Sequence, residues 1–290
     1  MSDRYETMPG AELGAACALA VRLQRAMRAY AAGRPALFSA AQFDAGFFAA
    51  LSMVSAFGSP WASPDELTAV TRASMWIGAL DHQVDVVAES RAEVDDLVAE
   101  CLAVARGEAP GGGSPLAGML ADIRDGLTGS LSAAPHPIWA DQVGRVLSAM
   151  AAEWRWKSEK ARIELGEYLD NADSVGSSFV NVSHWIATGD DWTRLHLEEL
   201  REVSGVVQRY LRLLNDLATH GRERESGDVN ALALGAGRDE VTARMAGLAA
   251  ECGPLLETVA AGSPRVALYL ERQIGFNTGF YGVTDYWGAK

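Results

Sequence analysis

The chain has 290 residues, of which 49% are apolar, and a formal net charge of −13 at pH 7. This length and apolar content suffice for one sizeable core, and we expect residues 1–290 to form a single domain. The acidic charge argues against nucleic acid as a partner, and it would repel a free diphosphate unless metal ions mediate binding. Ala and Leu abound while runs of β-branched residues are few, which predicts an all-α fold.

The cysteines and the first residues bear on the compartment. Cys17, Cys101 and Cys252 lie far apart without a C-x-x-C pair, which indicates reduced thiols, a cytoplasmic location and no zinc site. The start, MSDRYETMPG, lacks the basic region and the cleavage site of a secretory signal. No stretch is long and apolar enough to predict a membrane span.

The first half of the chain predicts helices separated by Gly- and Pro-containing turns. Ser63-Pro64 is a strong helix start, because Ser caps well and Pro suits the first turn. The Phe-rich stretch over 40–57 is mostly core, with Phe57 as a candidate for the wall of a pocket. GEAPGGGSP, residues 107–115, reads as a flexible surface loop without a phosphate-binding G-K-[ST]. The predicted helices cover residues 12–31, 40–57, 63–89, 91–106 and 116–131.

Two carboxylates stand out on the apolar helix Trp76–Glu89, WIGALDHQVDVVAE. Asp81 and Asp85 are one turn apart, and Glu89 follows a further turn on. Carboxylates at this spacing repel each other unless a positive charge lies between them. Taken alone, the pattern is more often the solvated edge of a helix.

The second half predicts helices over 138–162, 164–185, 198–223, 238–259 and 264–287. Ser174–Ser178, SVGSS, interrupts the second of these, since Gly costs about 1 kcal/mol relative to Ala in a helix. Such a weak point marks a kink, a place where backbone carbonyls face a ligand, or a tolerated packing glycine. The helix physics alone does not separate these alternatives.

A polar triad lies within the apolar helix LLNDLATHGRERE. Asn215, Thr219 and Glu223 recur every four residues, so they project from about one face. Four residues of helix rise about 6 Å, so the two long outer side chains must reach inward over the short Thr hydroxyl. Three converging oxygen donors suit a hard cation such as Mg²⁺, completed by water and phosphate oxygens.

The two motifs together resemble those of the class I terpene synthase family. Asp81–Asp85, DHQVD, is similar to its aspartate-rich motif, with His82 in place of the second Asp. Asn215–Glu223, NDLATHGRE, matches the pattern N-D-L-x-[ST]-x-x-[KR]-E at every specified position. The segments EWRWK, EYLDNADSVGSS and GDVN are also similar to that family, so the resemblance covers most of residues 50–290.

The resemblance implies a single-domain helical bundle around a central apolar cavity. It implies Mg²⁺ ligands at Asp81, Asp85, Asn215, Thr219 and Glu223, three ions in the substrate complex, and Mn²⁺ as an alternative metal. Gly176 falls at the family's effector glycine, where a helix breaks beside the substrate. The prenyl diphosphate would be the only small-molecule partner, and a homodimer is compatible with the family.

The diphosphate contacts depart from the family pattern. The usual sensor Arg would stand at position 172, which is Ala172 here, so Arg209 or Arg212 would have to supply it. Many relatives carry an Arg-Tyr pair near the end of the chain, and here the nearest match is Asp285-Tyr286. Arg222 is the expected direct cation by its place in the motif, and Tyr286 is a further candidate contact.

The resemblance also bears on the cavity and the substrate. A carbocation needs walls that stabilise it without reacting, and aromatic faces contribute about 1–2 kcal/mol each when desolvated. The candidate walls are Phe57, Trp76, Trp154, Trp185 and Tyr281. YLDNADSVGSS looks like bacterial diterpene synthases, which implies a C20 diphosphate, linear or of the labdane-type bicyclic kind, and a lyase whose product forms by deprotonation or water capture.

Three alternatives remain open. A sesquiterpene (C15) cyclase would carry the same motifs. A chain-elongating prenyltransferase would be expected to show two D-D-x-x-D motifs, and this sequence has neither intact. A non-catalytic helical partner-binding protein fits the acidic pairs Asp95-Asp96 and Glu198-Glu199, since charge runs are usually solvated, but it does not explain the polar triad within LLNDL.

Overall fold

The computed structural model describes residues 9–128 and 136–287. Every regular element in these ranges is a helix, which confirms the all-α expectation. The first half forms α1 (Gly10–Ala32), α2 (Pro35–Phe38), α3 (Ala45–Gly58), α4 (Thr68–His82), the π-helix η1 (Gln83–Val87), α5 (Arg91–Ala105) and α6 (Pro115–Thr128). The second half forms α7 (Pro137–Glu159), α8 (Leu165–Asp170), the 3₁₀-helix η2 (Ala172–Val175), α9 (Ser177–Thr188), α10 (Asp191–Leu195), α11 (Leu197–Ser226), α12 (Arg238–Gly262) and α13 (Pro264–Tyr281).

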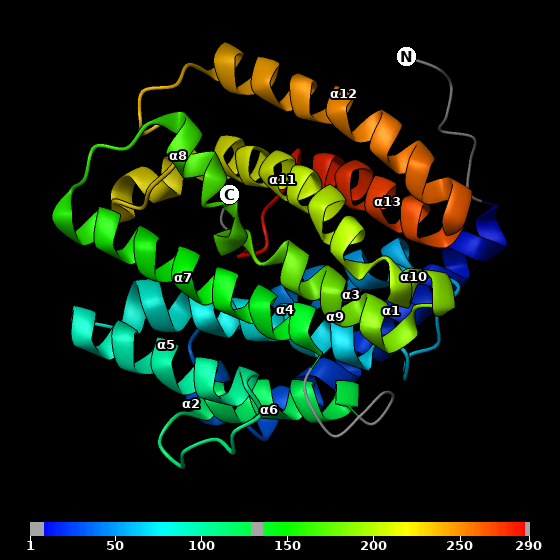
Figure 1. Ribbon diagram of the computed structural model, residues 1–290, viewed down its shortest axis with the longest axis horizontal. Helices are drawn as coiled ribbons and strands as arrows, with labels where there is room; N and C mark the ends of the chain where they lie inside the picture. Colours follow the sequence, from blue (N-terminus) through cyan, green and yellow to red (C-terminus); the bar gives the residue numbers. More distant parts are fainter. Residues whose placement is uncertain (1–8, 129–135, 288–290) are drawn as a thin grey trace.

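The helix α9 lies in the interior of the bundle. It packs against α4, α7 and α11, and most of its side chains are buried. Figure 1 shows α12 along the outer side of α11 and α13, with α5 and α6 on the opposite side of the molecule. Trp76 of α4 and Phe179 of α9 are fully buried with ring centroids 5.1 Å apart. Fully burying an apolar side chain of this kind stabilises the fold by about 1.5–3 kcal/mol.

The helix that carries the two aspartates is shorter than the predicted one. Ser63 and Glu66 exchange reciprocal hydrogen bonds, of 2.7 and 3.3 Å, as a helix-start signal requires. Regular α-helix nevertheless begins only at Thr68 and ends at His82. Asp85 follows in the single π-helical turn η1 rather than in a continuous α-helix. Such π turns are found frequently at functional sites.

The predicted interruption at Ser174–Ser178 is confirmed. The chain forms α8, then η2, and restarts as α9 after Gly176, whose φ of 75° lies in the left-handed region. A Cβ at this position would lie 2.4 Å from Cδ1 of Ile77 on α4. Glycine is therefore required twice here, for its backbone conformation and for the close approach of α4.

The predicted helix over 264–287 is too long. The helix α13 ends at Tyr281, and the chain then turns, with the N–H groups of Val283 and Thr284 both donating to the carbonyl of Phe280. Residues 282–287 run back beside α11, as the red end of the chain shows in Figure 1. The pattern stayed apolar and aromatic to Trp287, so periodicity did not reveal the turn.

Two further expectations concern the ends of elements and the membrane. The predicted helix over 116–131 is confirmed to Thr128, and its remaining residues lie outside the described ranges. Within residues 9–128 and 136–287, none of the helices combines the length and apolar character that crossing a bilayer requires.

Candidate active site

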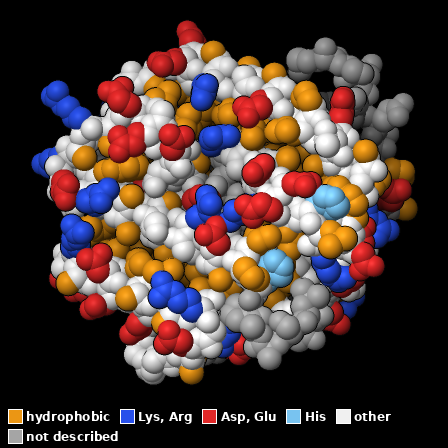
Figure 2. Space-filling view, in the orientation of Figure 1, with side chains coloured by type: hydrophobic (Ala, Val, Ile, Leu, Met, Phe, Trp, Pro, Cys, Tyr) orange, Lys and Arg blue, Asp and Glu red, His pale blue; other side chains and the backbone are white. Residues whose placement is uncertain are grey.

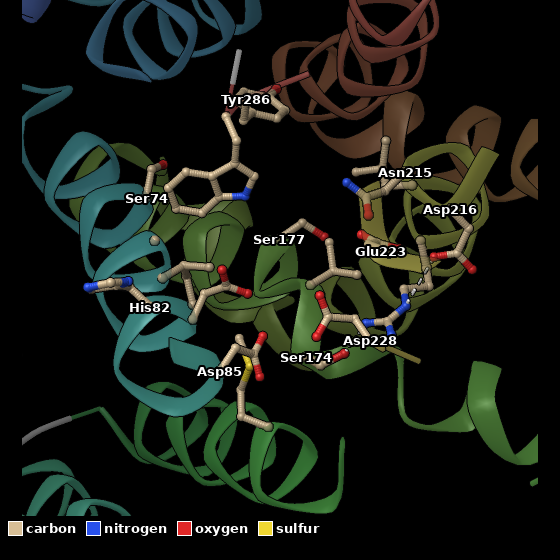
Figure 3. Close-up of a pocket in the computed structure, with 18 of the residues that line it drawn as sticks. Ser74, His82, Asp85, Ser174, Ser177, Asn215, Asp216, Glu223, Asp228 and Tyr286 are labelled. Atoms are coloured by element: carbon tan, nitrogen blue, oxygen red, sulfur yellow. Dashed lines mark hydrogen bonds and ion pairs between the residues drawn. The ribbon is translucent and has the colours of Figure 1, made fainter. Parts of the chain in front are cut away.

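A cavity of about 640 Å³ lies among α3, α4, α9, α11 and α13. Figure 2 shows a hollow near the centre of this face, with acidic and basic side chains gathered beside it. The cavity has apolar walls, to which Phe47, Leu51, Val54, Ile77 and Val180 belong. Its Asp, Glu and Arg side chains come from α4, η1, α7, α11 and the segment after α11. Figure 3 labels four of the acidic ones, Asp85, Asp216, Glu223 and Asp228. One cavity thus joins a charged region to a hydrocarbon-lined one.

Asp81 and Asp85 both line this cavity. Burial is the largest cause that raises the pKa of each carboxyl, and it is followed by negative neighbours: Glu153 and Asp228 for Asp81, and Asp81 and Asp228 for Asp85. Arg222 opposes the effect at Asp81, and Lys157 opposes it at Asp85. The site therefore carries more negative charge than the chain itself neutralises.

Two members of the polar triad line the cavity from α11. Asn215 donates from Nδ2 to the hydroxyl of Tyr281 at 2.9 Å, which leaves its carbonyl oxygen on the side of Thr219. The carboxylate of Glu223 accepts a hydrogen bond of 2.7 Å from the side-chain amide of Asn230, which holds the carboxylate in place. Figure 3 shows Asn215 and Glu223 on one side of the cavity and Asp85 on the other.

Thr219 is buried more deeply than its two neighbours. It is 1% exposed, it is not among the residues that line the cavity, and its hydroxyl donates to the backbone carbonyl of Asn215 at 2.8 Å. The oxygen keeps lone pairs that could accept or ligate. Its role as a ligand stays a prediction.

The structure adds acidic residues that the sequence motifs did not single out. Asp228, from the GDVN segment after α11, lines the cavity and lies 2.5 Å from Nζ of Lys157. Glu153 of α7 also lines the cavity. The resemblance of EWRWK and GDVN to the family was the only signal for them, because the two segments meet through the fold and share no helical period.

The donor set fits a hard divalent cation. Within the described ranges, no three His, Cys, Asp or Glu side chains are grouped closely enough to hold a metal ion alone. The available donors are carboxylate and amide oxygens, which suit Mg²⁺ better than a soft metal. An ion here would need water or phosphate oxygens as well, as is usual for Mg²⁺ at phosphate-handling sites.

Arg212 is the cation placed at the helix break. Its guanidinium donates to the hydroxyls of Tyr168 and Ser174, both at 2.5 Å, and it pairs with Glu153 at 2.8 Å. Both Arg212 and Ser174 line the cavity, although Arg212 is only 8% exposed. Of the two arginines predicted to replace a sensor at Ala172, Arg212 is therefore the one beside the break.

Arg209 does not reach this cavity, so its expected contact with the diphosphate is wrong. It lines a different, polar cavity of about 400 Å³ between α7, η2 and α11. Six residues separate Arg209 from Asn215, which turns its side chain about 120° away around the helix axis. Its Nε atom is buried without a hydrogen-bond partner among the described residues.

Arg222 and Tyr286 both line the cavity, as predicted for diphosphate contacts. Arg222 is paired with Glu223 at 3.7 Å and with the buried carboxylate of Asp285 at 3.8 Å. The hydroxyl of Tyr286 donates to Oδ1 of Asn277 at 2.6 Å. The carboxylate of Asp285, in the Asp285-Tyr286 pair near the end of the chain, therefore pairs with an arginine of α11.

Four of the five predicted aromatic walls belong elsewhere; only Tyr281 lines the cavity. Trp76 and Trp185 are at most 1% exposed in the core, and Nε1 of Trp76 donates to the carbonyl of Leu116. Trp154 packs against the core from outside, and Phe57 stacks on Phe276. A helical apolar pattern marks buried faces, but it does not separate a face packed on a neighbour from one that borders a cavity.

Gly176 itself is not among the lining residues, but its neighbours are. Ser174, Val175 and Ser177 border the cavity on both sides of the break. The buried side chain of Gln208 bridges the break: Oε1 accepts from Ser177 Oγ and Ser178 N–H, and Nε2 donates to Asp173. The break is thus held in one conformation by α11.

An all-helical bundle whose acidic side chains surround one end of an apolar cavity defines a class I terpene synthase. The chain belongs to terpene synthase family 2: the family's C-terminal metal-binding model matches residues 72–236. The matched segment includes both acidic motifs, and the enzyme takes a divalent metal cofactor. This confirms the family, the enzyme class and the metal dependence that the motifs suggested.

Relatives and solved structures agree with this assignment. The chain is 27% identical over 285 residues, 93% of each sequence, to ent-pimara-9(11),15-diene synthase of Streptomyces sp. (strain KO-3988). Its fold is similar to 2-methylisoborneol synthase from Streptomyces coelicolor A3(2) with Mg²⁺ and 2-fluoroneryl diphosphate, with a TM-score of 0.73, 14% identity, and 94% and 91% of the two chains covered. Linalool/nerolidol synthase from Streptomyces clavuligerus with 2-fluorogeranyl diphosphate gives a TM-score of 0.69, 15% identity, and 93% and 98% coverage.

Proposed function

We propose that this enzyme ionises a C20 prenyl diphosphate, linear or labdane-type bicyclic, with Mg²⁺, and then cyclises or rearranges the resulting carbocation. The observation that carries the proposal is one cavity that has Asp81 and Asp85 on one side of its charged region, Asn215 and Glu223 on the other, and apolar walls in the rest of its lining. A diphosphate leaves poorly in an apolar cavity because its charge cannot be solvated there.

In this proposal the two acidic motifs hold the metal. Asp81 and Asp85 would ligate from α4 and η1, and Asn215, Thr219 and Glu223 from α11, with three ions in the substrate complex and Mn²⁺ as a substitute. Bound Mg²⁺ would neutralise the charge that develops on the diphosphate oxygens. The elevated pKa values of Asp81 and Asp85 support this role, since a bound cation would supply the positive charge that they lack.

The cationic side chains of the cavity would bind the diphosphate directly. Arg222, 36% exposed, faces the cavity from the metal-motif helix. Arg212 would act in place of the absent sensor at Ala172, because its hydrogen bond to Ser174 connects it to the break. Tyr286 would donate its hydroxyl after exchanging Asn277 for a phosphate oxygen. The carbocation would finally lose a proton or capture water.

The chain length of the substrate is supported by a relative and not by the shape of the cavity. The similarity to ent-pimara-9(11),15-diene synthase spans 93% of both chains, which favours a diterpene substrate. The solved structures that share the fold include α-eudesmol synthase and cucumene synthase, at 16% and 18% identity. A C15 cyclase is therefore the second candidate.

Product analysis by mass spectrometry tests the proposal. The enzyme is incubated with C15, linear C20 and bicyclic C20 diphosphates plus Mg²⁺, with EDTA as the metal-free control. We expect diphosphate release and a cyclised hydrocarbon or alcohol from a C20 substrate only when Mg²⁺ is present. Turnover of the C15 substrate alone would overturn the C20 assignment and leave the metal sites standing.

Two variants test the metal-binding residues in the same assay. Asp85→Ala and Asn215→Ala should each abolish diphosphate release while helical content stays unchanged, because each removes one side-chain oxygen donor and leaves the backbone hydrogen bonds in place. Full activity of either variant would remove that motif from the metal site. A wild type that releases no diphosphate from any of the three substrates would favour a non-catalytic helical protein.

A further inference from the structure

The segment after α13 enters the cavity through Trp287. Its indole ring stacks on Phe47 of α3, with centroids 5.2 Å apart and an interplanar angle of 17°, and it meets Phe43 edge-on at 5.9 Å. Both Trp287 and Phe47 line the cavity. Sequence periodicity assigned Trp287 to a helix, and the turn after Tyr281 places it on the cavity wall instead.

A glycine of α4 makes room for this aromatic pair. Gly78 also lines the cavity, and a Cβ on it would lie 2.7 Å from Cζ of Phe47 and 3.8 Å from Cη2 of Trp287. Gly78 precedes Asp81 by three residues, close to one turn of helix, which is a rise of about 5 Å. The indole therefore borders the cavity near the end that carries the carboxylates. In a bound substrate, the carbons next to the diphosphate would lie there.

The same segment is attached to the charged end of the cavity. The backbone N–H of Trp287 donates to Oδ1 of Asp285 at 2.9 Å, and Oδ2 of Asp285 lies 3.8 Å from Nη1 of Arg222. Asp285 is 4% exposed, so its carboxylate is held in a fixed place. Between them, Tyr286 is anchored on Asn277 of α13. Three consecutive residues thus contact α11, α13 and the α3–α4 pair.

From these contacts we infer that Trp287 is a specificity-determining residue, whose indole limits the size and shape of the hydrocarbon that the cavity accepts. Asp285 positions it, because that carboxylate binds the Trp287 backbone and the cation of the metal-motif helix together. The inference rests on the proposed function for the class of substrate.

The expected effect follows from the space that the ring occupies. Trp287→Ala would open the cavity beside Gly78 and Phe47, so a longer or bulkier hydrocarbon would gain contacts that a shorter one cannot reach. One extra or missing methylene in an apolar pocket discriminates substrates by about 10- to 200-fold. We therefore expect the preference for a C20 over a C15 chain to rise about tenfold in Trp287→Ala. Trp287→Phe should change it less, because it keeps a ring against Phe47.

The test measures binding as well as turnover. Dissociation constants for the inert C15 and C20 prenyl S-thiolodiphosphates are measured with Mg²⁺ by titration calorimetry, for the wild type, Trp287→Phe and Trp287→Ala. Trp61→Ala is the matched control, since Trp61 is 37% exposed and lies outside the cavity. The same variants are then assayed for product distribution. A C20/C15 ratio in Trp287→Ala equal to that of the wild type overturns the inference.

Two variants of Asp285 test the positioning. Asp285→Asn keeps an oxygen that can accept from the Trp287 N–H, so it should retain the wild-type ratio. Asp285→Ala removes the acceptor and should shift the ratio in the same direction as Trp287→Ala. An unchanged ratio in Asp285→Ala shows that Asp285 does not position the ring. Because binding of inert analogues needs no turnover, a wild type inactive on every substrate contradicts only the proposed function, and the binding ratio still decides the inference.

Discussion

The guanidinium of Arg212 lies 2.8 Å from the carboxylate of Glu153, so a cation of α11 is paired with an anion of α7 beside the break at Gly176. The same guanidinium donates to Tyr168 and Ser174 from separate nitrogens. The planar guanidinium reaches the three partners from three different nitrogens, whereas an ammonium offers all of its donors from one nitrogen on a flexible stem.

Arg212→Lys should therefore slow diphosphate release while the protein remains folded. It keeps the charge that Glu153 requires but loses the bond to Ser174, and removing one well-placed donor costs about 10²–10³ in rate. The measurement is a steady-state assay of diphosphate release, accompanied by a thermal melt. Arg145→Lys is the control, because Arg145 also pairs with an acid on a helix but is exposed. A normal rate in Arg212→Lys would exclude Arg212 as the replacement sensor.

The metal-free protein should lose stability as the pH rises from about 6.5 to about 8.5. Asp81 and Asp85 have raised pKa values, first through burial and then through acidic neighbours. Each therefore holds more protons folded than unfolded, so the free energy of unfolding falls as the pH rises through the folded pKa. His184 changes the stability only below this pH range. Burial lowers its pKa to about 4, so its contribution to stability is lost as the pH falls.

Thermal melts in EDTA across this pH range check the prediction. We expect the melting temperature to fall by roughly 2 °C for each kcal/mol of lost stability. Asp85→Asn should flatten the dependence and should melt higher than the wild type at the alkaline end. Adding Mg²⁺ with inorganic diphosphate should restore the melting temperature of the wild type at the alkaline end. A melting temperature that rises with pH in both proteins would contradict the assigned charge excess.

Gly176→Ala should destabilise the fold in two separable ways. The left-handed conformation costs an L-residue about 1–2 kcal/mol, and the new methyl would meet Ile77 at 2.4 Å. Unfolding curves for Gly176→Ala, Ile77→Ala and the double variant form a cycle that isolates the clash. In the double variant, removing the Ile77 side chain should relieve the steric part of the stability loss caused by Gly176→Ala, and the backbone part should remain. Gly205→Ala is the control, because a Cβ there meets nothing within 4 Å. Strict additivity of the two variants would show that the clash is absent.

Gln208→Leu should loosen the break without touching the proposed metal ligands. Its Oε1 accepts from the backbone N–H of Ser178 in the first turn of α9, and a buried donor left unpaired costs about 1–3 kcal/mol. We expect a lower melting temperature together with a fall in kcat that exceeds any rise in KM. Gln142→Leu removes only the other donor to Asp173 and should have the smaller effect. Equal effects of the two variants would argue against a role at the start of α9.

The sequence predicted those parts of the site that follow a helical period. Asp81, Asp85, Asn215 and Glu223 all line one cavity, and their four-residue spacing predicted that each motif shares one face. Arg222 lines the same cavity, and it was predicted from its place in the family motif. The break at Ser174–Ser178 was also predictable, since Gly and clustered Ser weaken a helix. Their roles as ligands stay predictions.

The remaining parts depend on how segments meet in space. Asp228 and Glu153 come from a loop and from a separate helix, and no spacing relates them to Asp81. Trp76 and Trp185 were assigned to the cavity and lie in the core, since both environments favour the same residues. Trp287 was assigned to a helix, and it lines the cavity only because the chain turns after Tyr281.

The side chain of Asn230 has a consequence for how the site opens. Its amide donates to the backbone carbonyl of Asp216 at 3.0 Å and to the carboxylate of Glu223 at 2.7 Å. The segment after α11 and the last turns of that helix are thereby joined through one buried group. Local unfolding of either releases the other, so affinity for metal would be lost at a lower denaturant concentration than the helical signal of the whole bundle.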